Sequence, residues 1–210
     1  QRIDTLPEWA VRHGNYIDGH HTLKQLSLEL LTEALIRIPS DNVPLVLDTT
    51  ELFLDRNAGI LGNFPFLRHF NPIAEWHLKK KRAQLDEMLF DVIRQRRKSD
   101  KEGTDLISRM LAVKDPDGTM SLNDQEIRDE TMTMMVAGYE TTASGLTWTF
   151  VELAKNPDIQ DRLAREIREA VGTDHIKLEH LPDIPLATNV FLEALRLYPA
   201  TWAIARELNT

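Results

Sequence analysis

The 210-residue sequence contains no cysteine, which excludes disulfides, zinc–thiolate sites and a cysteine nucleophile within it. It has no apolar run near the ~20 residues of a membrane helix, and it opens with no signal peptide. Positive charge is also scarce, since the sequence has 25 Lys and Arg but 33 Asp and Glu, which gives a formal net charge of −8. Nucleic-acid-binding domains usually concentrate Lys and Arg into a basic patch, so nucleic acid is not an expected partner.

What the sequence does contain is an ordinary globular composition, 42% hydrophobic and 28% charged, which is sufficient for one sizeable core. Apolar residues recur at helical spacing along most of it. A first helix is predicted from residue 22 to a stop at Pro39, and others at 44–56, 72–98, 105–113, 121–155, 157–171 and 186–198. The predicted N-caps are Thr104, Ser121 and Asn156. With 202–208 as the one strand candidate, the predicted fold class is mainly α, with one long central helix and little or no sheet.

The middle of the central helix is rich in residues that helices disfavour. Gly138 and Gly145 each cost roughly 1 kcal/mol against alanine in a helix interior. At helical spacing they share a face with Ala137 and Thr141, which makes a stripe of small residues. Such a stripe lets something approach the backbone closely. A crossing helix is the ordinary interpretation, and the alternative is a flat ligand with Glu140 and Thr141 beside it.

Two motifs carry a family resemblance. Residues 137–142 read Ala-Gly-Tyr-Glu-Thr-Thr, and the later run Glu-Ala-Leu-Arg at 193–196 continues as Leu-Tyr-Pro. The first resembles the [Ala/Gly]-Gly-x-[Asp/Glu]-Thr-[Thr/Ser] signature in the central helix of cytochrome P450, the haem-thiolate monooxygenases. The second resembles the Glu-x-x-Arg motif of that family, and Arg206 falls where these proteins often carry an arginine that meets a haem propionate. The resemblance covers the whole chain as a middle segment of a longer protein.

The resemblance implies a monooxygenase that holds haem b and inserts one oxygen atom from O2 into an apolar organic substrate, using a ferredoxin or a flavoprotein reductase as electron donor. By resemblance, Thr141 and Glu140 are the hydroxyl and carboxylate that deliver protons, while Ala137 and Gly138 leave room for the porphyrin and the oxygen. Glu193 and Arg196 then form the structural ion pair of the family.

The residues by themselves leave plainer alternatives open. Glu140 is equally a charge on the helix surface, and Thr141 a hydroxyl bonded back to the carbonyl of Ala137. Glu193 and Arg196, three apart on one helix, equally form a surface pair. A non-catalytic helical scaffold that uses the small-residue stripe for packing is the rival function from another class.

The iron ligand of the family is a cysteine thiolate in a loop beyond the position of Arg206. The metal ligand is therefore expected beyond Thr210, and residues 1–210 are expected to be one partial domain truncated at both ends. Such a segment is expected to be inactive, to bind haem weakly if at all, and to self-associate through uncovered apolar surface. The expected location is the cytoplasm for a bacterial source, with a membrane anchor before Gln1 as the alternative.

Overall fold

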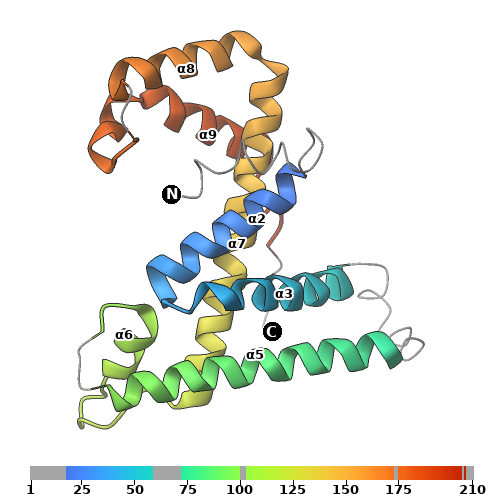
Figure 1. Cartoon of the computed structure of the whole chain (residues 1–210), viewed down its shortest axis with the longest axis vertical. Helices are drawn as coiled ribbons and strands as arrows, with labels where there is room; N and C mark the ends of the chain where they lie inside the picture. Colours follow the sequence, from blue (N-terminus) through green and yellow to red (C-terminus); the bar gives the residue numbers. More distant parts are fainter. Residues whose placement is uncertain (1–17, 59–71, 100–102, 173–174, 205, 207–210) are drawn as a thin grey trace. The chain divides into compact units, whose positions relative to one another are not determined.

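The protein is mainly α-helical, as the sequence predicts (Figure 1). The structure, a computed structural model, describes residues 18–58, 72–99, 103–172, 175–204 and 206. Its helices are α2 (Gly19–Leu31), α3 (Val43–Ala58), α5 (Pro72–Lys98), α6 (Leu106–Ala112), α7 (Asp124–Lys155), α8 (Pro157–Val171) and α9 (Pro185–Leu197), with short helical segments η2 (Thr32–Ile36), η3 (Ser40–Asn42) and η5 (Leu178–Asp183).

Among the described residues no strand forms, and the isolated bridge between Lys114 and Met120 is the only β pairing there. The expected strand at 202–208 is therefore wrong at residues 202–204 and 206, because no described segment forms a ladder with them. Its remaining residues lie outside the described part. None of the described helices has the length and apolar content that a membrane span requires.

Contacts divide the chain into two compact units, one made of residues 1–24 and 140–210 and the other of residues 25–139. The division falls within α2 after Lys24 and within α7 after Tyr139. Each unit has its own buried side chains, and the candidate functional residues are divided between them.

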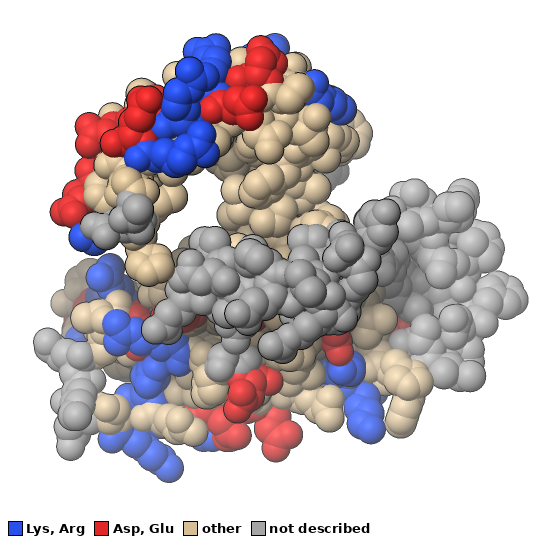
Figure 2. All heavy atoms as spheres, turned by 45° about the horizontal axis from the view of Figure 1, so that its top comes forward, with Lys and Arg blue, Asp and Glu red and all other residues tan. Residues whose placement is uncertain are grey.

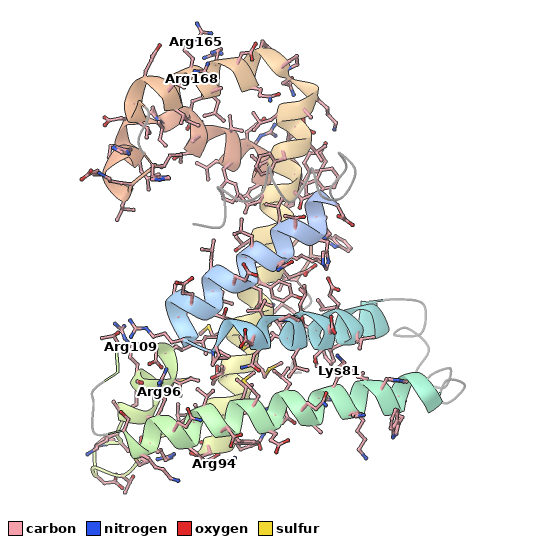
Figure 3. The ribbon with its side chains drawn as sticks, viewed as in Figure 1. Lys81, Arg94, Arg96, Arg109, Arg165 and Arg168 are labelled. Atoms are coloured by element: carbon pink, nitrogen blue, oxygen red, sulfur yellow. The ribbon has the colours of Figure 1, made fainter. Side chains whose placement is uncertain are left out.

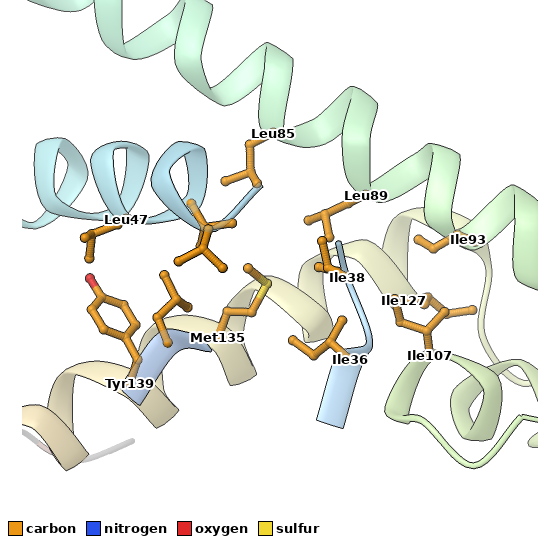
Figure 4. Close-up of a cluster of buried hydrophobic side chains, with 13 residues drawn as sticks. Ile36, Ile38, Leu47, Leu85, Leu89, Ile93, Ile107, Ile127, Met135 and Tyr139 are labelled. Atoms are coloured by element: carbon orange, nitrogen blue, oxygen red, sulfur yellow. The ribbon is translucent and has the colours of Figure 1, made fainter. Parts of the chain in front are cut away.

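The core of the 25–139 unit brings together α3, α5, α6 and the first part of α7 (Figure 4). On α5, the buried residues Leu85, Leu89 and Ile93 are four apart, which places them on one face of the helix. Fully buried Ile107 of α6 and Met135 of α7 belong to the same cluster. This regular apolar spacing is the reason why the sequence predicts α5 with its observed bounds.

In the other unit, α8 and α9 pack against each other. Gly145 of α7 is buried, and a Cβ built on it would lie 3.1 Å from a methyl carbon of Leu195 and 3.3 Å from the ring of Phe191. The missing side chain therefore lets α9 approach the backbone of α7. Close by on α7, the ring of Trp148 stacks on that of Tyr198, with centroids 4.0 Å apart.

The outward side of α8 carries charges of both signs next to one another, at the top of Figure 2. Its exposed charged residues are Asp158, Asp161, Arg162, Arg165, Arg168 and Glu169. Opposite charges interspersed in this way cancel at a distance, so α8 does not present the single-sign patch that nucleic acid requires.

The first residue of α7 is fixed by a reciprocal cap that the sequence interpretation placed two residues too early. Asn123, rather than Ser121, accepts a 3.0 Å hydrogen bond from the backbone N–H of Glu126, and the Glu126 carboxylate accepts one of 2.7 Å from the Asn123 N–H. Asn156 also differs from expectation. It occupies the N-cap position of α8 as predicted, but its side chain makes no capping bond there and instead donates to the carbonyl of Glu152 at the end of α7.

The N-cap of α6 is Asp105, and Thr104 lies one residue too early to serve. Asp105 has the extended backbone that a cap needs (φ −76°, ψ 165°), and its carboxylate accepts a 3.1 Å hydrogen bond from the N–H of Ser108. Its side chain is only 3% exposed and lies 3.2 Å from Nε of Arg96 on α5, so the cap also ties α6 to α5.

Replacing this cap, Asp105→Ala, is expected to lower the free energy of unfolding by about 1 to 2 kcal/mol near neutral pH. Burial alone would raise the pKa of Asp105, but the hydrogen bonds from the Ser108 amide and hydroxyl, helped by Arg96, hold it below its ordinary value of 3.8. Because the folded pKa is the lower one, this stabilisation is present above pH 3.8 and is lost as the pH falls through the folded pKa.

Urea unfolding of the variant and the unchanged protein, near neutral pH and again in acid, measures this difference. The difference in the free energy of unfolding between the two proteins should shrink toward zero in acid. Asp161→Ala, at an exposed position within α8, is the control and should change stability by less than about 0.5 kcal/mol at either pH. A loss for Asp105→Ala that is the same at both pH values would show that the carboxylate does not act in its charged form.

Candidate functional site

Ala137 and Thr141 lie on the exposed side of α7. Both are exposed, and residues four apart on a helix fall on the same side. Tyr139 points elsewhere and is fully buried, with its hydroxyl 2.8 Å from Oγ1 of Thr50. The exposed side of α7 is thus lined here by small side chains, which suits the close approach of a flat ligand.

Gly138, three residues before Thr141, packs against another helix. A Cβ built on Gly138 would lie 3.0 and 3.2 Å from the two methyl carbons of Leu31 on α2, closer than side-chain carbons normally come. The glycine thus allows Leu31 to pack on the backbone of α7, as Gly145 does for α9. The stripe of small residues therefore has two kinds of position. Neighbouring helices pack against its glycines, whereas Ala137 and Thr141 remain exposed.

Glu140 is held by a lysine from α2. The Lys24 Nζ lies 3.2 Å from Oε1 of Glu140, and the two side chains are 14% and 32% exposed. Oε2 of Glu140 is buried and has no hydrogen-bond partner among the described residues. A buried carboxylate oxygen without a partner is costly, so this atom is suited to accept a hydrogen bond from a group brought by a ligand or by water.

A second contact orients the same side of α2 toward α7. His20, one turn before Lys24, lies with its Nδ1 3.0 Å from Oγ1 of Thr147. Because Thr147 is seven residues after Glu140 in the same helix, the two contacts follow one side of α7. Lys24 is therefore positioned by its helix and not only by the attraction of the carboxylate.

A cavity of about 510 Å³ adjoins Ala137 within the 25–139 unit. Its mostly apolar wall includes Thr50 and Phe53 of α3, Leu85 of α5, and Met132, Val136 and Ala137 of α7. Small-molecule pockets have volumes of about 300 to 1,000 Å³ and walls of this mixed but mainly apolar kind. The exposed side of α7 at Ala137 is thus also a wall of a ligand-sized cavity.

Arg128 contributes a cation to the same cavity, with a side chain that is 12% exposed. It pairs with Asp86 of α5, and its Nη1 donates to Oδ1 of Asp129 at 2.6 Å. Burial works against the charged form of Arg128, but the hydrogen bonds to Asp86 and Asp129 outweigh it and raise its pKa. The bond from Arg128 likewise lowers the pKa of Asp129, so Arg128 and Asp129 both stay charged.

Glu193 and Arg196 form a two-bonded ion pair on the surface of α9. Arg196 donates from Nε and Nη2 to the two oxygens of Glu193, each at 2.7 Å, and this bond lowers the pKa of Glu193 and raises that of Arg196. The side chains are 55% and 66% exposed in the described chain.

Arg206 is an exposed residue of a non-helical segment. In the described part of the chain, no three His, Asp or Glu side chains gather as a metal ion would require.

Sequence reasoning missed Lys24 and Arg128. Lys24 lies in another helix, far from Glu140 in the sequence, and no local signal links the two. Arg128 lies near the start of the central helix, and the sequence analysis did not single it out. Its partner Asp86 lies in α5, 42 residues earlier, so no local sequence pattern links the two.

Comparisons with known proteins agree on one family. The family model described as Cytochrome P450 matches residues 38–210. Pentalenene oxygenase of Streptomyces avermitilis is 31% identical over 213 residues, covering 96% of this chain and 45% of that protein. Cytochrome P450 4A14 of Rattus norvegicus is 37% identical over 134 residues, covering 63% of this chain and 25% of that protein. The crystal structure of the cytochrome P450DA haem domain superposes with a TM-score of 0.72 at 22% identity, covering 86% of this chain and 40% of that one. The chain thus spans less than half the length of these relatives.

Proposed function

The chain belongs to the cytochrome P450 family, and we propose that the whole protein is a haem-dependent monooxygenase. It would insert one oxygen atom from O2 into an apolar organic substrate, with a ferredoxin or a flavoprotein reductase as electron donor. The 210 residues contain no cysteine, so the thiolate ligand is proposed to lie outside them, and these residues alone are proposed to be inactive.

The observation that carries the proposal is the combination of Glu140 and Thr141 on α7. Oε2 of Glu140 is buried without a partner, while Thr141 beside it is exposed, one turn after exposed Ala137. Small exposed side chains would admit a flat group, and a carboxylate oxygen without a hydrogen-bond partner, next to a hydroxyl, would serve proton delivery. These residues fit haem and O2 on the exposed side of α7.

Bound haem would supply the iron at which O2 is activated. Thr141 would donate the proton of its Oγ1 on the oxygen side, and Glu140 would resupply it through Oε2 or a water molecule. Lys24, bonded to Oε1, would keep the carboxylate turned toward α2 and leave Oε2 for this task. Ala137 would limit the bulk beside the porphyrin, and the apolar cavity would hold substrate while excluding bulk water.

Three further residues keep the roles that the resemblance implies. Arg206 is proposed to meet a haem propionate, and its exposed guanidinium is compatible with that role. Glu193 and Arg196 are proposed to be covered in the whole protein and to hold the fold around the haem. For Gly138 the resemblance implies room for the porphyrin and the oxygen, and we propose instead that it lets α2 and α7 pack closely through Leu31.

A helical scaffold remains a second candidate, favoured by the packing of Leu31 at Gly138 and of Leu195 at Gly145. The two functions differ in one requirement, because a scaffold needs no cofactor. The same glycine contacts are also compatible with an enzyme, since Ala137 and Thr141 beside them remain exposed.

The proposal predicts that the full-length protein, produced in cells supplied with a haem precursor, is purified with one haem per chain. Its reduced carbonyl form should give a Soret band of the thiolate-ligated type. Pyridine haemochrome analysis measures the first and a carbon monoxide difference spectrum the second. A folded protein with helical circular dichroism but without haem would favour the scaffold function instead.

A further inference from the structure

Of the six methionines in the sequence, Met132 of α7 is the one that lines the cavity beside Ala137. Its side chain is half-buried and also packs against the core of the 25–139 unit. Figure 3 shows sulfur atoms, drawn in yellow, beside α7 at the level of α3 and α5, the helices that form the rest of the cavity wall. The thioether of Met132 is thus part of a mainly apolar wall that a bound molecule would contact.

The other methionines have different surroundings. Met134, two residues after Met132, falls on the opposite side of α7 and is 49% exposed, and Met120 is 44% exposed. The remaining three lie in the core or pack against it: Met88, Met110 and Met135. Oxidation by an agent dissolved in the solvent follows exposure, so Met134 and Met120 should react with such an agent before Met132 does.

The polar side chains of the cavity wall are already engaged. Thr49, Thr50 and Thr133 each donate their hydroxyl to a backbone carbonyl of their own helix, at 2.6, 2.9 and 2.9 Å. Arg82 is exposed, so a bond to it would have to replace one with water. A sulfoxide oxygen at Met132 would therefore add a polar group without a ready partner, which costs free energy when an apolar ligand displaces its water.

We propose, resting on the proposed function, that Met132 is a site of self-oxidation. Hydrogen peroxide formed in the cavity, when O2 is reduced without reaching substrate, oxidises the Met132 thioether, and the resulting sulfoxide weakens the binding of apolar ligands. The sulfur gives an electron pair to one oxygen of the peroxide, the O–O bond breaks, and the other oxygen leaves as water. Met132 precedes Ala137 by five residues, about 7.5 Å along α7, so the thioether lies near the side where O2 is proposed to react.

Peptide mass spectrometry on the full-length holoprotein tests the site without measuring activity. The protein is oxidised in two ways, by dilute hydrogen peroxide added to the solution, and by electron donor and O2 without substrate, with catalase present to destroy peroxide that escapes. We expect the ratio of sulfoxide at Met132 to sulfoxide at Met134 and Met120 to be about fivefold higher or more in the second case, because peroxide formed in the cavity reaches Met132 first. An unchanged ratio overturns the local oxidation.

Isothermal titration calorimetry with naphthalene, an uncharged apolar molecule, tests the effect on binding. Oxidation at Met132 should weaken naphthalene binding about tenfold, and methionine sulfoxide reductases should restore it. Met132→Leu, a swap of similar volume, should lose no affinity on oxidation, because it has no sulfur to oxidise. Met134→Leu is the matched control from the same helix and should lose affinity as the unchanged protein does.

Three results would overturn the effect on binding. Naphthalene could fail to bind the unoxidised protein, its affinity could survive oxidation of Met132, or its affinity could fall equally in Met132→Leu. Haem content and peroxide release, measured on the same samples, separate this inference from the proposed function. Haem-loaded protein that releases peroxide but leaves Met132 unoxidised overturns the self-oxidation and leaves the monooxygenase standing. Protein without haem overturns the proposed function and with it the local source of peroxide. The effect on binding then stands if oxidation with added peroxide weakens naphthalene binding through Met132, and falls if it does not.

Discussion

In the full-length protein, Thr141→Ala is expected to keep its haem content and to release most of the electrons it consumes as hydrogen peroxide instead of product. The substitution removes Oγ1, the proposed last proton donor, but leaves the helix and its exposed side intact. Alanine is a better helix former than threonine, so stability should not fall. Losing a positioned proton donor typically costs a hundredfold or more, and we expect product formed per electron pair to fall roughly tenfold or more.

Electron-donor consumption, peroxide and product are measured together in one reaction. Thr149→Ala is the matched control, because Thr149 is in the same helix and its hydroxyl is already donated to the carbonyl of Gly145 at 2.7 Å. The control should remain coupled. If Thr141→Ala also converts its electrons to product as efficiently as the unchanged protein, Thr141 is not the proton donor and Glu140 must act without it.

The helices were predictable because their apolar spacing and their stop signals are local. The bounds of α5 agree with the prediction, and α7 ends at Lys155, just before Asn156 and Pro157, as expected. The caps were less predictable. Thr104 and Asp105 are both good cap residues, and the choice between them depends on which one adopts extended backbone and meets Arg96, a contact between α6 and α5.

The candidate site was predictable as a set of residues but not as an arrangement. The spacing that places Gly138 near Thr141 on a helical wheel does not say that Leu31 occupies the position of the missing Cβ. Nor could the sequence pair Glu140 with Lys24, because such a contact depends on how two helices cross. Local spacing was sufficient only for Glu193 and Arg196, which pair within one helix.

Removing either partner of the ion pair between Glu193 and Arg196 is the other change with a large expected effect. Either Glu193→Ala or Arg196→Ala in the full-length protein is expected to reduce haem-loaded, soluble protein roughly tenfold or more. On the surface of α9 such a pair contributes little to stability, because solvent screens it. If the rest of the protein covers it, as the family resemblance implies, removing one partner leaves a buried charge without compensation, which is strongly destabilising.

The pair of Asp91 and Arg94 on α5 is the control, since it has the same spacing of three residues and similar exposure, 54% and 55%. Asp91→Ala and Arg94→Ala should leave the yield of holoprotein unchanged. The double reversal Glu193→Arg with Arg196→Glu then separates a local pair from one held by further groups. A pair that acts only within α9 regains its attraction when reversed, whereas a pair that also bonds to the surrounding protein presents each of those groups with the wrong charge. We therefore expect the reversal to fail as completely as the single variants, and recovery of normal holoprotein would show that Glu193 and Arg196 form only a surface bridge.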